Sequence, residues 1–222
     1  MILVLLGLSI FGCNANTIQE NTRACDAGNS DGCFTLGLAY AQGKEVKQDF
    51  SKATTYYAKA CDTGKSLGCL YLGFAYTDGR GVKQDDSKAS SYYTKACDAG
   101  DTGGCLFLGL AYAQGKGIKQ DDSKANIYFS KACDAGDNGG CFNLGFAYAQ
   151  GKGIKQDDAK ANSYFTKACA AENSNGCFAL GVAYLQGKGV RQSDVKAKEL
   201  FRKACNLGYN AGCENHAILN KN

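Results

Sequence analysis

The chain has 222 residues, of which 45% are hydrophobic, and its 25 Lys and Arg against 21 Asp and Glu leave a net charge of only +4. The two signs are interleaved along the chain, so no clustered basic surface forms, and we predict no nucleic-acid partner. Only one histidine, His216, is present, and the cysteines lack the close C-x-x-C spacing of zinc sites. We therefore predict no metal and no cofactor.

The first segment is an apolar run, Met1–Gly12, which is too short to span a bilayer but fits the apolar region of a signal peptide. We predict that residues 1–13 are a signal peptide or lipoprotein signal and that the protein is exported, either to the periplasm or to the medium. Ile10 to Cys13 resemble a bacterial lipobox, in which Cys13 would become the lipidated N-terminus. Such an anchor would be the chain's only membrane contact.

The following residues repeat with a period of 36, most clearly in Cys97–Ala132 and Cys133–Ala168, and a half-repeat begins at Cys205. An uninterrupted period in this range is typical of a solenoid, in which each supersecondary unit stacks on the next. We predict an all-α αα-solenoid over residues 25–213. A short segment over 14–24, containing the end of a truncated helix, would precede it, and a polar cap over 214–222 would follow.

Each repeat begins with a helical pattern, which in the second repeat runs over Gly68–Thr77. Its apolar residues from Cys69 to Tyr76 follow the i, i+3, i+4, i+7 spacing of a buried helix face. Phe74 belongs to a second apolar stripe, so we expect this helix to be packed on most sides. Gly73 recurs in every repeat although Gly costs about 1 kcal/mol against Ala in a helix, which predicts that two helix backbones approach closely there.

A glycine-rich loop and a second helix complete each repeat. We expect one aliphatic residue per loop to insert into the core: Val46, Val82, Ile118, Ile154 and Val190. Repeat one carries Glu45 where the other repeats have Gly, so we expect a different turn there. We predict an N-cap at the start of each second helix, where a short polar side chain accepts a hydrogen bond from a backbone N–H that the helix leaves unpaired. The five residues are Asp49, Asp85, Asp121, Asp157 and Ser193.

Twelve of the 13 cysteines form six pairs with identical spacing: Cys25/Cys33, Cys61/Cys69, Cys97/Cys105, Cys133/Cys141, Cys169/Cys177 and Cys205/Cys213. Regular pairs at this density favour disulfides, and hence an oxidising compartment, over reduced thiols or a metal site. Two pairings remain open, the local C-x7-C bridge and a bridge such as Cys69 to Cys97 within one helical hairpin. The local bridge is favoured by its lower loop-closure entropy.

The motifs Leu-Gly-x-x-Tyr, Gly-x-Gly-Val/Ile, Asp-x-x-Lys-Ala and Tyr-Phe-x-Lys-Ala-Cys in a 36-residue frame resemble Sel-one-like repeats, which are relatives of the tetratricopeptide repeat. The added C-x7-C pair is similar to the Helicobacter cysteine-rich protein (Hcp) family. The resemblance covers residues 23–213. It implies a right-handed solenoid stapled by C-x7-C disulfides, export, and one of two functions: a protein-binding scaffold, or a weak β-lactamase that binds penicillins.

The enzyme alternative has one local motif, an S-x-x-K match from Ser193 to Lys196. Serine β-lactamases also use S-D-N and K-T-G motifs, and this chain contains neither. Ser193 stands in the column of the capping Asp residues and Lys196 in a column of lysines, so we predict a helix cap and no catalytic residue. Hydrolase activity then rests on the resemblance alone, and a β-lactam or peptidoglycan-like small molecule would bind in a cleft between repeats.

The preferred function is binding of a protein or peptide, because the first helices line the concave surface in the related solenoids. A stripe at positions equivalent to 35, 39 and 42 would face this groove, with a variable first member, a constant Ala and a polar end. Tyr71 and Phe107 would be aromatic anchors, unless they only pack against neighbouring helices, and Asn143 is similar to the Asn that clamps peptides in tetratricopeptide domains. The predicted binding residues are Thr35, Tyr71, Asp78, Phe107, Gln114, Asn143, Gln150 and Gln186.

Overall fold

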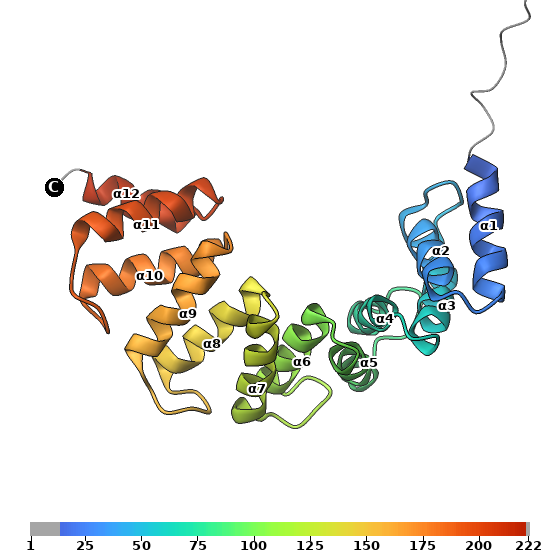
Figure 1. The fold of residues 1–222 in the computed structure, drawn as a ribbon, viewed down its shortest axis with the longest axis horizontal. Helices are drawn as coiled ribbons and strands as arrows, with labels where there is room; N and C mark the ends of the chain where they lie inside the picture. The colour runs from blue at the N-terminus through green and yellow to red at the C-terminus, as the bar shows by residue number, and fades with distance from the viewer. Residues whose placement is uncertain (1–13, 221–222) are drawn as a thin grey trace, which may run out of the picture. The chain divides into compact units, whose positions relative to one another are not determined.

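The computed structural model describes residues 14–220, which form twelve α-helices and no strand (Figure 1). Eleven of them have 13 residues, one for each half-repeat, and the last is shorter. Their bounds are α1 Asn14–Asp26, α2 Ser30–Gln42, α3 Phe50–Asp62, α4 Ser66–Asp78, α5 Asp86–Asp98, α6 Thr102–Gln114, α7 Asp122–Asp134, α8 Asn138–Gln150, α9 Asp158–Ala170, α10 Ser174–Gln186, α11 Asp194–Asn206 and α12 Asn210–Leu219.

The helices group into two compact units that meet in sequence at Asp101 and Thr102. Within each unit, helices that are consecutive in sequence pack against each other, which is the stacking that an αα-solenoid requires and confirms the predicted fold class. Even-numbered helices are the first helices of the repeats and odd-numbered helices are the second. Across residues 14–220, no helix is both long enough and apolar enough to cross a bilayer.

The predicted helix starts are confirmed in every repeat. The side chains of all five predicted N-cap residues accept a hydrogen bond from the backbone N–H three residues later, at the start of α3, α5, α7, α9 and α11. These bonds satisfy donors that the helix itself leaves unpaired. Ser193 is one of these caps, and it accepts from the backbone N–H of Lys196 at 3.3 Å.

At the repeated glycine of the first helix the nearest neighbour is an aromatic ring, although at Gly109 and Gly145 a backbone oxygen of the second helix also lies 3.1–3.3 Å from an added Cβ, as a close backbone approach requires. A Cβ on Gly73 would overlap the ring of Tyr93, and one on Gly145 would lie 2.8 Å from the ring of Phe165. The glycine therefore makes room for an aromatic ring of the second helix. A closer approach of two backbones occurs five residues earlier, where a Cβ on Gly68 would lie 2.7 Å from the backbone nitrogen of Cys61.

Within the two units, the disulfides join the end of a second helix to the start of the next first helix. Five bridges close the C-x7-C spacing with Cα atoms 4.5–4.6 Å apart: Cys25–Cys33, Cys61–Cys69, Cys133–Cys141, Cys169–Cys177 and Cys205–Cys213. Cys97 and Cys105 are disulfide-bonded as well. Six disulfides indicate that the protein folds in an oxidising environment; the predicted export signal and lipidation site, residues 1–13, lie outside the described residues.

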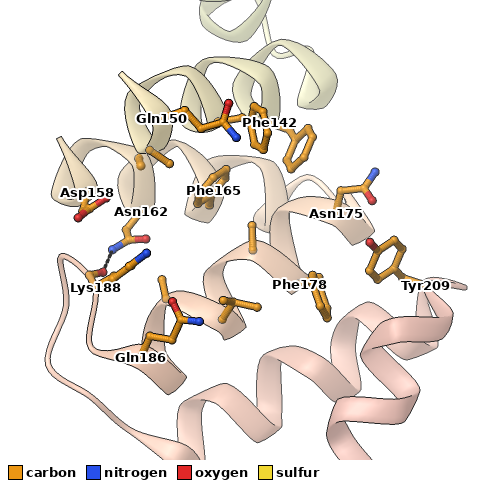
Figure 2. Close-up of a pocket in the computed structure, with 16 residues that line it drawn as sticks. Phe142, Gln150, Asp158, Asn162, Phe165, Asn175, Phe178, Gln186, Lys188 and Tyr209 are labelled. Atoms are coloured by element: carbon orange, nitrogen blue, oxygen red, sulfur yellow. Dashed lines mark hydrogen bonds between the residues drawn. The ribbon is translucent and has the colours of Figure 1, made fainter. Parts of the chain in front are cut away.

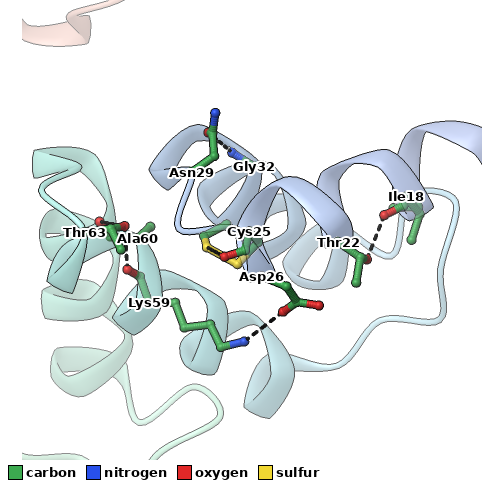
Figure 3. The surroundings of a disulfide bond; sticks show 10 residues. Ile18, Thr22, Cys25, Asp26, Asn29, Gly32, Lys59, Ala60 and Thr63 are labelled. Carbon is green, nitrogen blue, oxygen red and sulfur yellow. Dashed lines mark hydrogen bonds and ion pairs between the residues drawn. A yellow bond between two sulfur atoms is a disulfide. The ribbon is translucent and has the colours of Figure 1, made fainter.

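Figure 3 shows the first of these junctions. The side chain of Asn29 caps α2 by accepting from Gly32 N–H at 3.0 Å, beside the disulfide of Cys25. From the next second helix, Lys59 reaches back to Asp26 with Nζ 3.5 Å from Oδ1. The turn is thus held by three interactions: the disulfide, the N-cap hydrogen bond and an ion pair between neighbouring second helices.

The N-terminal helix and the loops differ from the predictions. α1 spans Asn14–Asp26 and is as long as the other second helices, so the segment over 14–24 is not the end of a truncated helix. At the other end, Glu214 belongs to α12 and not to a separate cap. The loop aliphatic residues, such as Val46, are only half-buried. Glu45 has φ 65°, close to the φ of 75° at the equivalent Gly81, so the turn conformation is retained without glycine.

A second aromatic feature recurs outside the buried core. In four repeats, half-buried tyrosines of the first and second helix stack with ring centroids 5.5–5.6 Å apart: Tyr40/Tyr56, Tyr76/Tyr92, Tyr112/Tyr128 and Tyr148/Tyr164. A lysine ammonium lies 5.2–5.5 Å from the centroid of each of these rings. These cation–π sandwiches tie the two helices of a repeat together at the surface.

Candidate binding grooves

Three grooves lie between consecutive first helices, with a second helix as the floor. The N-terminal groove, about 430 Å³ in volume, is formed by α2, α3 and α4 and lined chiefly by Leu38, Phe50, Tyr57, Tyr71, Phe74 and Arg80. The central groove, about 210 Å³, is formed by α6, α7 and α8 and lined chiefly by Leu110, Gln114, Phe129, Asn143 and Phe146. The C-terminal groove, about 440 Å³, is formed by α8, α9 and α10 and lined chiefly by Phe146, Gln150, Asn162, Phe165, Phe178 and Gln186.

The three grooves are built in the same register. The floor of each contains an Ala and an aromatic ring at equivalent positions of the second helix, which are Ala161 and Phe165 in the C-terminal groove. A basic residue from the loop stands at the rim of each, namely Arg80, Lys152 or Lys188. The grooves therefore follow from the repeat itself, whereas their chemistry depends on the residues that vary between repeats.

The C-terminal groove combines aromatic rings with amides (Figure 2). In this view the rings of Phe142, Phe165 and Phe178 lie at the top, in the middle and at the lower right, with the amide of Gln150 beside Phe142 and that of Gln186 at the lower left. Such a surface suits an extended chain, because the rings offer apolar contact and each amide both donates and accepts hydrogen bonds.

Asn162 is the buried amide of this groove, only 6% exposed. Its Nδ2 donates to the carbonyl oxygen of Lys188 at 2.7 Å, and Asn126 makes the same bond to Lys152 in the central groove. Figure 2 shows that the amide oxygen of Asn162 points away from this loop. One half of the amide thus positions the loop that forms the rim, and the other half is an acceptor in the groove wall.

Phe146 lines both the central and the C-terminal groove, and its side chain is 44% exposed. The equivalent Phe74 of repeat two is half-buried, so Phe146 is the more exposed of the two. The centroid of the Phe146 ring lies 6.2 Å from that of Phe142. Phe146 is thus an exposed aromatic ring shared by two grooves.

The sequence-predicted binding residues fall into two groups. Six line the grooves: Tyr71 and Asp78 in the N-terminal groove, Gln114 and Asn143 in the central groove, and Gln150 and Gln186 in the C-terminal groove. Thr35 and Phe107 are not among the residues that line these three grooves. The predicted stripe therefore marks the groove walls, but not the floors and rims contributed by the second helices and the loops.

Two of the predicted anchors are already engaged within the chain. The ring of Tyr71 packs 5.3 Å from the rings of both Phe34 and Tyr57, so it is part of an aromatic cluster as well as of the groove wall. The Nδ2 of Asn143 donates to the carbonyl oxygen of Gly139 in its own helix at 2.8 Å. In this arrangement Asn143 has its amide oxygen and its second N–H to offer to a ligand.

The floor ring of the N-terminal groove, Tyr57, carries an unpaired hydroxyl. Tyr57 is 4% exposed, and its oxygen has no hydrogen-bond partner. Burial, together with the nearby phenol of Tyr71, raises the pKa of Tyr57 to about 12. The equivalent Tyr93 is also buried, but its hydroxyl lies 2.8 Å from Oγ1 of Thr77. The residue equivalent to Thr77 in repeat one is Ala41, which has no hydroxyl to offer.

Ser193 and Lys196, which form the S-x-x-K match, and the single histidine, His216, contact residues of the solenoid. Ser193 caps α11, and the ammonium of Lys196 lies 5.0 Å from the centroid of the Tyr184 ring. The ring of His216 lies within 3.4 Å of the side-chain amide of Asn220. Within residues 14–220, no group of three or more His, Cys, Asp or Glu side chains is placed to hold a metal ion.

Comparison with known proteins supports the fold. The Sel1 repeat family model matches residues 30–65, 66–101, 103–137, 139–173 and 174–209. Among solved structures, the protective antigen c5321 of uropathogenic Escherichia coli is 29% identical, with a TM-score of 0.84 over 88% of this chain. The present chain spans only 42% of that antigen's length. A Sel1 repeat protein from Oxalobacter formigenes is 22% identical, with a TM-score of 0.80 over 90% of this chain and 85% of that one.

The cysteine-rich protein B of Helicobacter pylori is 34% identical over 58% of this chain and 92% of that one, with a TM-score of 0.48. No curated protein matches the chain. The five family matches leave out the two ends of the solenoid and residues 102 and 138, and each match covers nearly all of one first helix and the second helix that follows it. The chain belongs to the Sel1 repeat family.

Proposed function

We propose that this protein is an exported scaffold that binds an extended segment of a partner protein in its grooves. The observation that carries this proposal is the recurrence of grooves at one register, each with an aromatic floor, a wall of Gln or Asp, and a basic residue at the rim. An extended chain presents side chains and backbone amides at regular intervals. Because the grooves share one register, short segments of one partner can occupy more than one of them in the same way.

The chemistry of the groove walls favours a neutral, partly apolar segment. The C-terminal groove is lined by four aromatic residues besides Phe146, while its only charged lining residues are Asp158 and Lys188, one of each sign. Because these charges offset each other, a highly charged ligand would gain little. An aromatic or aliphatic side chain packed beside Phe146, with its backbone bonded to Gln150 or Gln186, would bury apolar surface and keep its polar groups paired.

The disulfides and the N-terminal sequence support export. Six disulfides require an oxidising compartment, and residues 1–13 have the composition of a signal segment. Cell fractionation followed by intact-mass measurement tests this part of the proposal. We expect extracytoplasmic protein with all twelve paired cysteines oxidised; reduced protein in the cytoplasm would contradict it.

The binding proposal is tested by selecting peptides from a random 12-residue library on the purified, oxidised protein and measuring the affinity of the best peptide by calorimetry. We expect Phe146→Ala to weaken binding at least tenfold, since an exposed aromatic anchor contributes more than about 1.4 kcal/mol. Ile127→Ala is the matched control, because Ile127 is also a large exposed hydrophobic residue (56%) and lines none of the three grooves. Equal loss in both variants, or no selected peptide, would contradict the proposal.

The hydrolase alternative is tested with nitrocefin on three proteins, wild type, Ser193→Ala and Ser193→Asp. Ser193 acts as a helix cap, so we expect Ser193→Ala to lower the free energy of unfolding by about 1 kcal/mol and Ser193→Asp to preserve it. Asp is the cap in four other repeats. If the wild type turned over nitrocefin and both variants lost this activity, Ser193 would be more than a helix cap, and hydrolysis would be supported.

A further inference from the structure

The starting point is the unsatisfied hydroxyl of Tyr57. Its oxygen is buried and has no partner, and leaving a buried polar group unpaired opposes folding. Four other repeats avoid this situation at the equivalent position. Tyr93 shares a hydrogen bond with Thr77, and Phe129, Phe165 and Phe201 have no hydroxyl. Among the described residues, repeat one is thus the only one of the five in which this ring carries a buried hydroxyl without a partner.

The surroundings of the Tyr57 hydroxyl follow from a comparison with Tyr93 in repeat two. In repeat two the hydroxyl of Tyr93 meets the residue at position 77, four residues after the glycine on which its ring packs. The ring of Tyr57 packs on Gly37 in the same way, which directs its hydroxyl toward Ala41. Both Ala41 and Tyr57 line the N-terminal groove. The Thr77 hydroxyl of repeat two therefore has no counterpart in repeat one, where the equivalent residue is Ala41.

We infer that the N-terminal groove contains a hydrogen-bonding subsite, in which the Tyr57 hydroxyl donates to a backbone carbonyl oxygen of an extended partner segment and Ala41 keeps the hydroxyl available. This inference rests on the proposed binding function and assigns a polar specificity to one of its grooves. Ala41 and Tyr57 are its specificity-determining residues.

A neutral carbonyl fits this subsite better than a carboxylate. Burying a carboxylate requires a nearby cation to compensate its charge. The cation at this rim is Arg80, whose Nε already lies 3.4 Å from Oδ2 of Asp78. The lining of the groove includes three large apolar side chains, Leu38, Phe50 and Phe74, and these residues would contact an aromatic or aliphatic side chain of the same segment.

The hydroxyl of Tyr57 is buried although the residue lines the groove, so binding would require a neighbouring side chain to move. The half-buried ring of Tyr71 lies 5.3 Å from that of Tyr57 and lines the same groove. A turn of the Tyr71 side chain opens a path to the hydroxyl. Side-chain rotations of this kind are common when a ligand binds. The ligand would then replace an aromatic contact with a hydrogen bond and an apolar contact of its own.

The test uses N-acetyl-phenylalanine N-methylamide as a probe, because it presents one aromatic side chain and neutral backbone carbonyls. Its binding to the oxidised protein is followed by NMR titration of the residues that line the N-terminal groove, in the wild type and in Tyr57→Phe, Ala41→Thr and Tyr93→Phe variants. N-acetyl-phenylalanine, which ends in a carboxylate, is the control ligand, and its affinity is compared with that of the neutral probe. Thermal unfolding is measured for the same proteins without ligand.

We expect Tyr57→Phe and Ala41→Thr each to weaken binding of the neutral probe about three- to tenfold, which is the value of one hydrogen bond. Both variants should unfold about 2–4 °C higher than the wild type, because the first removes the unpaired hydroxyl and the second gives it the partner seen in repeat two. Tyr93→Phe breaks a satisfied pair, so it should unfold at a lower temperature and leave the affinity unchanged. The carboxylate ligand should bind more weakly than the neutral probe.

Several results would overturn the inference: affinity unchanged in Tyr57→Phe and Ala41→Thr, no shift of N-terminal groove residues by the probe, or tighter binding of the carboxylate. Unchanged thermal stability in Tyr57→Phe would also overturn it, since an ordered water would then satisfy the hydroxyl. These failures are separable from failure of the proposed function, because peptide binding that depends on Phe146 involves other grooves.

Discussion

The N-terminal and C-terminal grooves share a framework and differ in chemistry. Both have an aromatic ring on the floor that packs on a glycine of the first helix, Tyr57 on Gly37 and Phe165 on Gly145. In the C-terminal groove the buried polar position is Asn162, which is bonded to the loop, and the ring has no hydroxyl. In the N-terminal groove that position is Thr54, which bonds within its own helix, and the ring carries an unpaired hydroxyl.

The difference shows how a repeat protein separates stability from specificity. Positions that pack between helices, such as the glycine and the ring, keep the same shape because a change of volume would disturb the stack. The polarity of these positions can change while the shape is kept, as when Tyr57 of one groove is replaced by Phe165 in another. Each groove thereby acquires its own pattern of hydrogen-bond donors and acceptors on one backbone design.

The largest expected effect concerns alkaline pH. Burial raises the pKa of Tyr57 to about 12 from the ordinary value of 10.0. The folded state therefore holds this proton more tightly than the unfolded state. The stabilisation of the folded state by protonated Tyr57, relative to ionised Tyr57, is complete below pH 10 and is lost as the pH rises from about 10 to 12. The loss is at most about 2–3 kcal/mol. Urea unfolding at pH 9 and pH 11 should show a smaller decrease for Tyr57→Phe than for the wild type; parallel decreases would contradict the assignment.

The shared framework is tested by adding one methyl group to each groove. Gly37→Ala and Gly145→Ala should each lower the free energy of unfolding by about 1–3 kcal/mol, because the new Cβ overlaps the floor ring. The overlap is more severe for Gly37, so its variant should be the less stable of the two by urea unfolding. Gly136→Ala is the steric control, since a Cβ there meets nothing within 4 Å, although its φ of 92° adds backbone strain. Equal stability of Gly37→Ala and wild type would contradict this packing.

The rim of the C-terminal groove depends on Asn162. We expect Asn162→Ala to lower the free energy of unfolding by about 1–2 kcal/mol and to increase hydrogen exchange in the loop around Lys188, because it removes the donor to that carbonyl. Thr54→Ala is the matched change in the N-terminal groove. Thr54 bonds only to Ser51 in its own helix, so the loop around Arg80 should exchange as in the wild type. Loosening of both loops would show that burial, and not the amide, positions the rim.

The smallest expected effect is at the turns before the first helices. Glu172 precedes α10 of the C-terminal groove with φ 60°, whereas Gly64 occupies the equivalent position before α4 of the N-terminal groove. A left-handed conformation is unfavourable for a residue with a Cβ. Glu172→Gly should therefore raise the free energy of unfolding by about 0.5–1 kcal/mol and Gly64→Glu should lower it by a similar amount. Thermal unfolding measures both, and shifts of the same sign would contradict the argument.

Several features could be predicted from the sequence because they depend on local chemistry. The N-caps at Asp49 and Ser193 follow from the hydrogen-bonding capacity of short polar side chains before a helix. The pairing of Cys61 with Cys69 follows from a short loop between two helix ends. Six of the eight predicted binding residues line grooves because a helical stripe at spacing i, i+4, i+7 stays on one face.

Other features depended on side chains from different helices. The aromatic ring that packs on Gly73 could not be predicted, because Tyr93 is 20 residues away in the sequence. The exposure of Phe146 could not be read from its column, since the same column holds the half-buried Phe74. The length of α1 was underestimated because its residues carry little of the repeat's pattern.

By itself the sequence determined the all-α class, the repeat boundaries, the helix starts and the disulfide spacing, since each of these is repeated five times and depends on residues close in the chain. Only the tertiary structure decided which polar groups are satisfied. Whether Tyr57 has a partner depends on the side chain that a neighbouring helix presents at Ala41, and whether Asn162 faces a ligand depends on the loop at Lys188. Hydrogen bonding between distant residues requires their positions in space, which no local pattern contains.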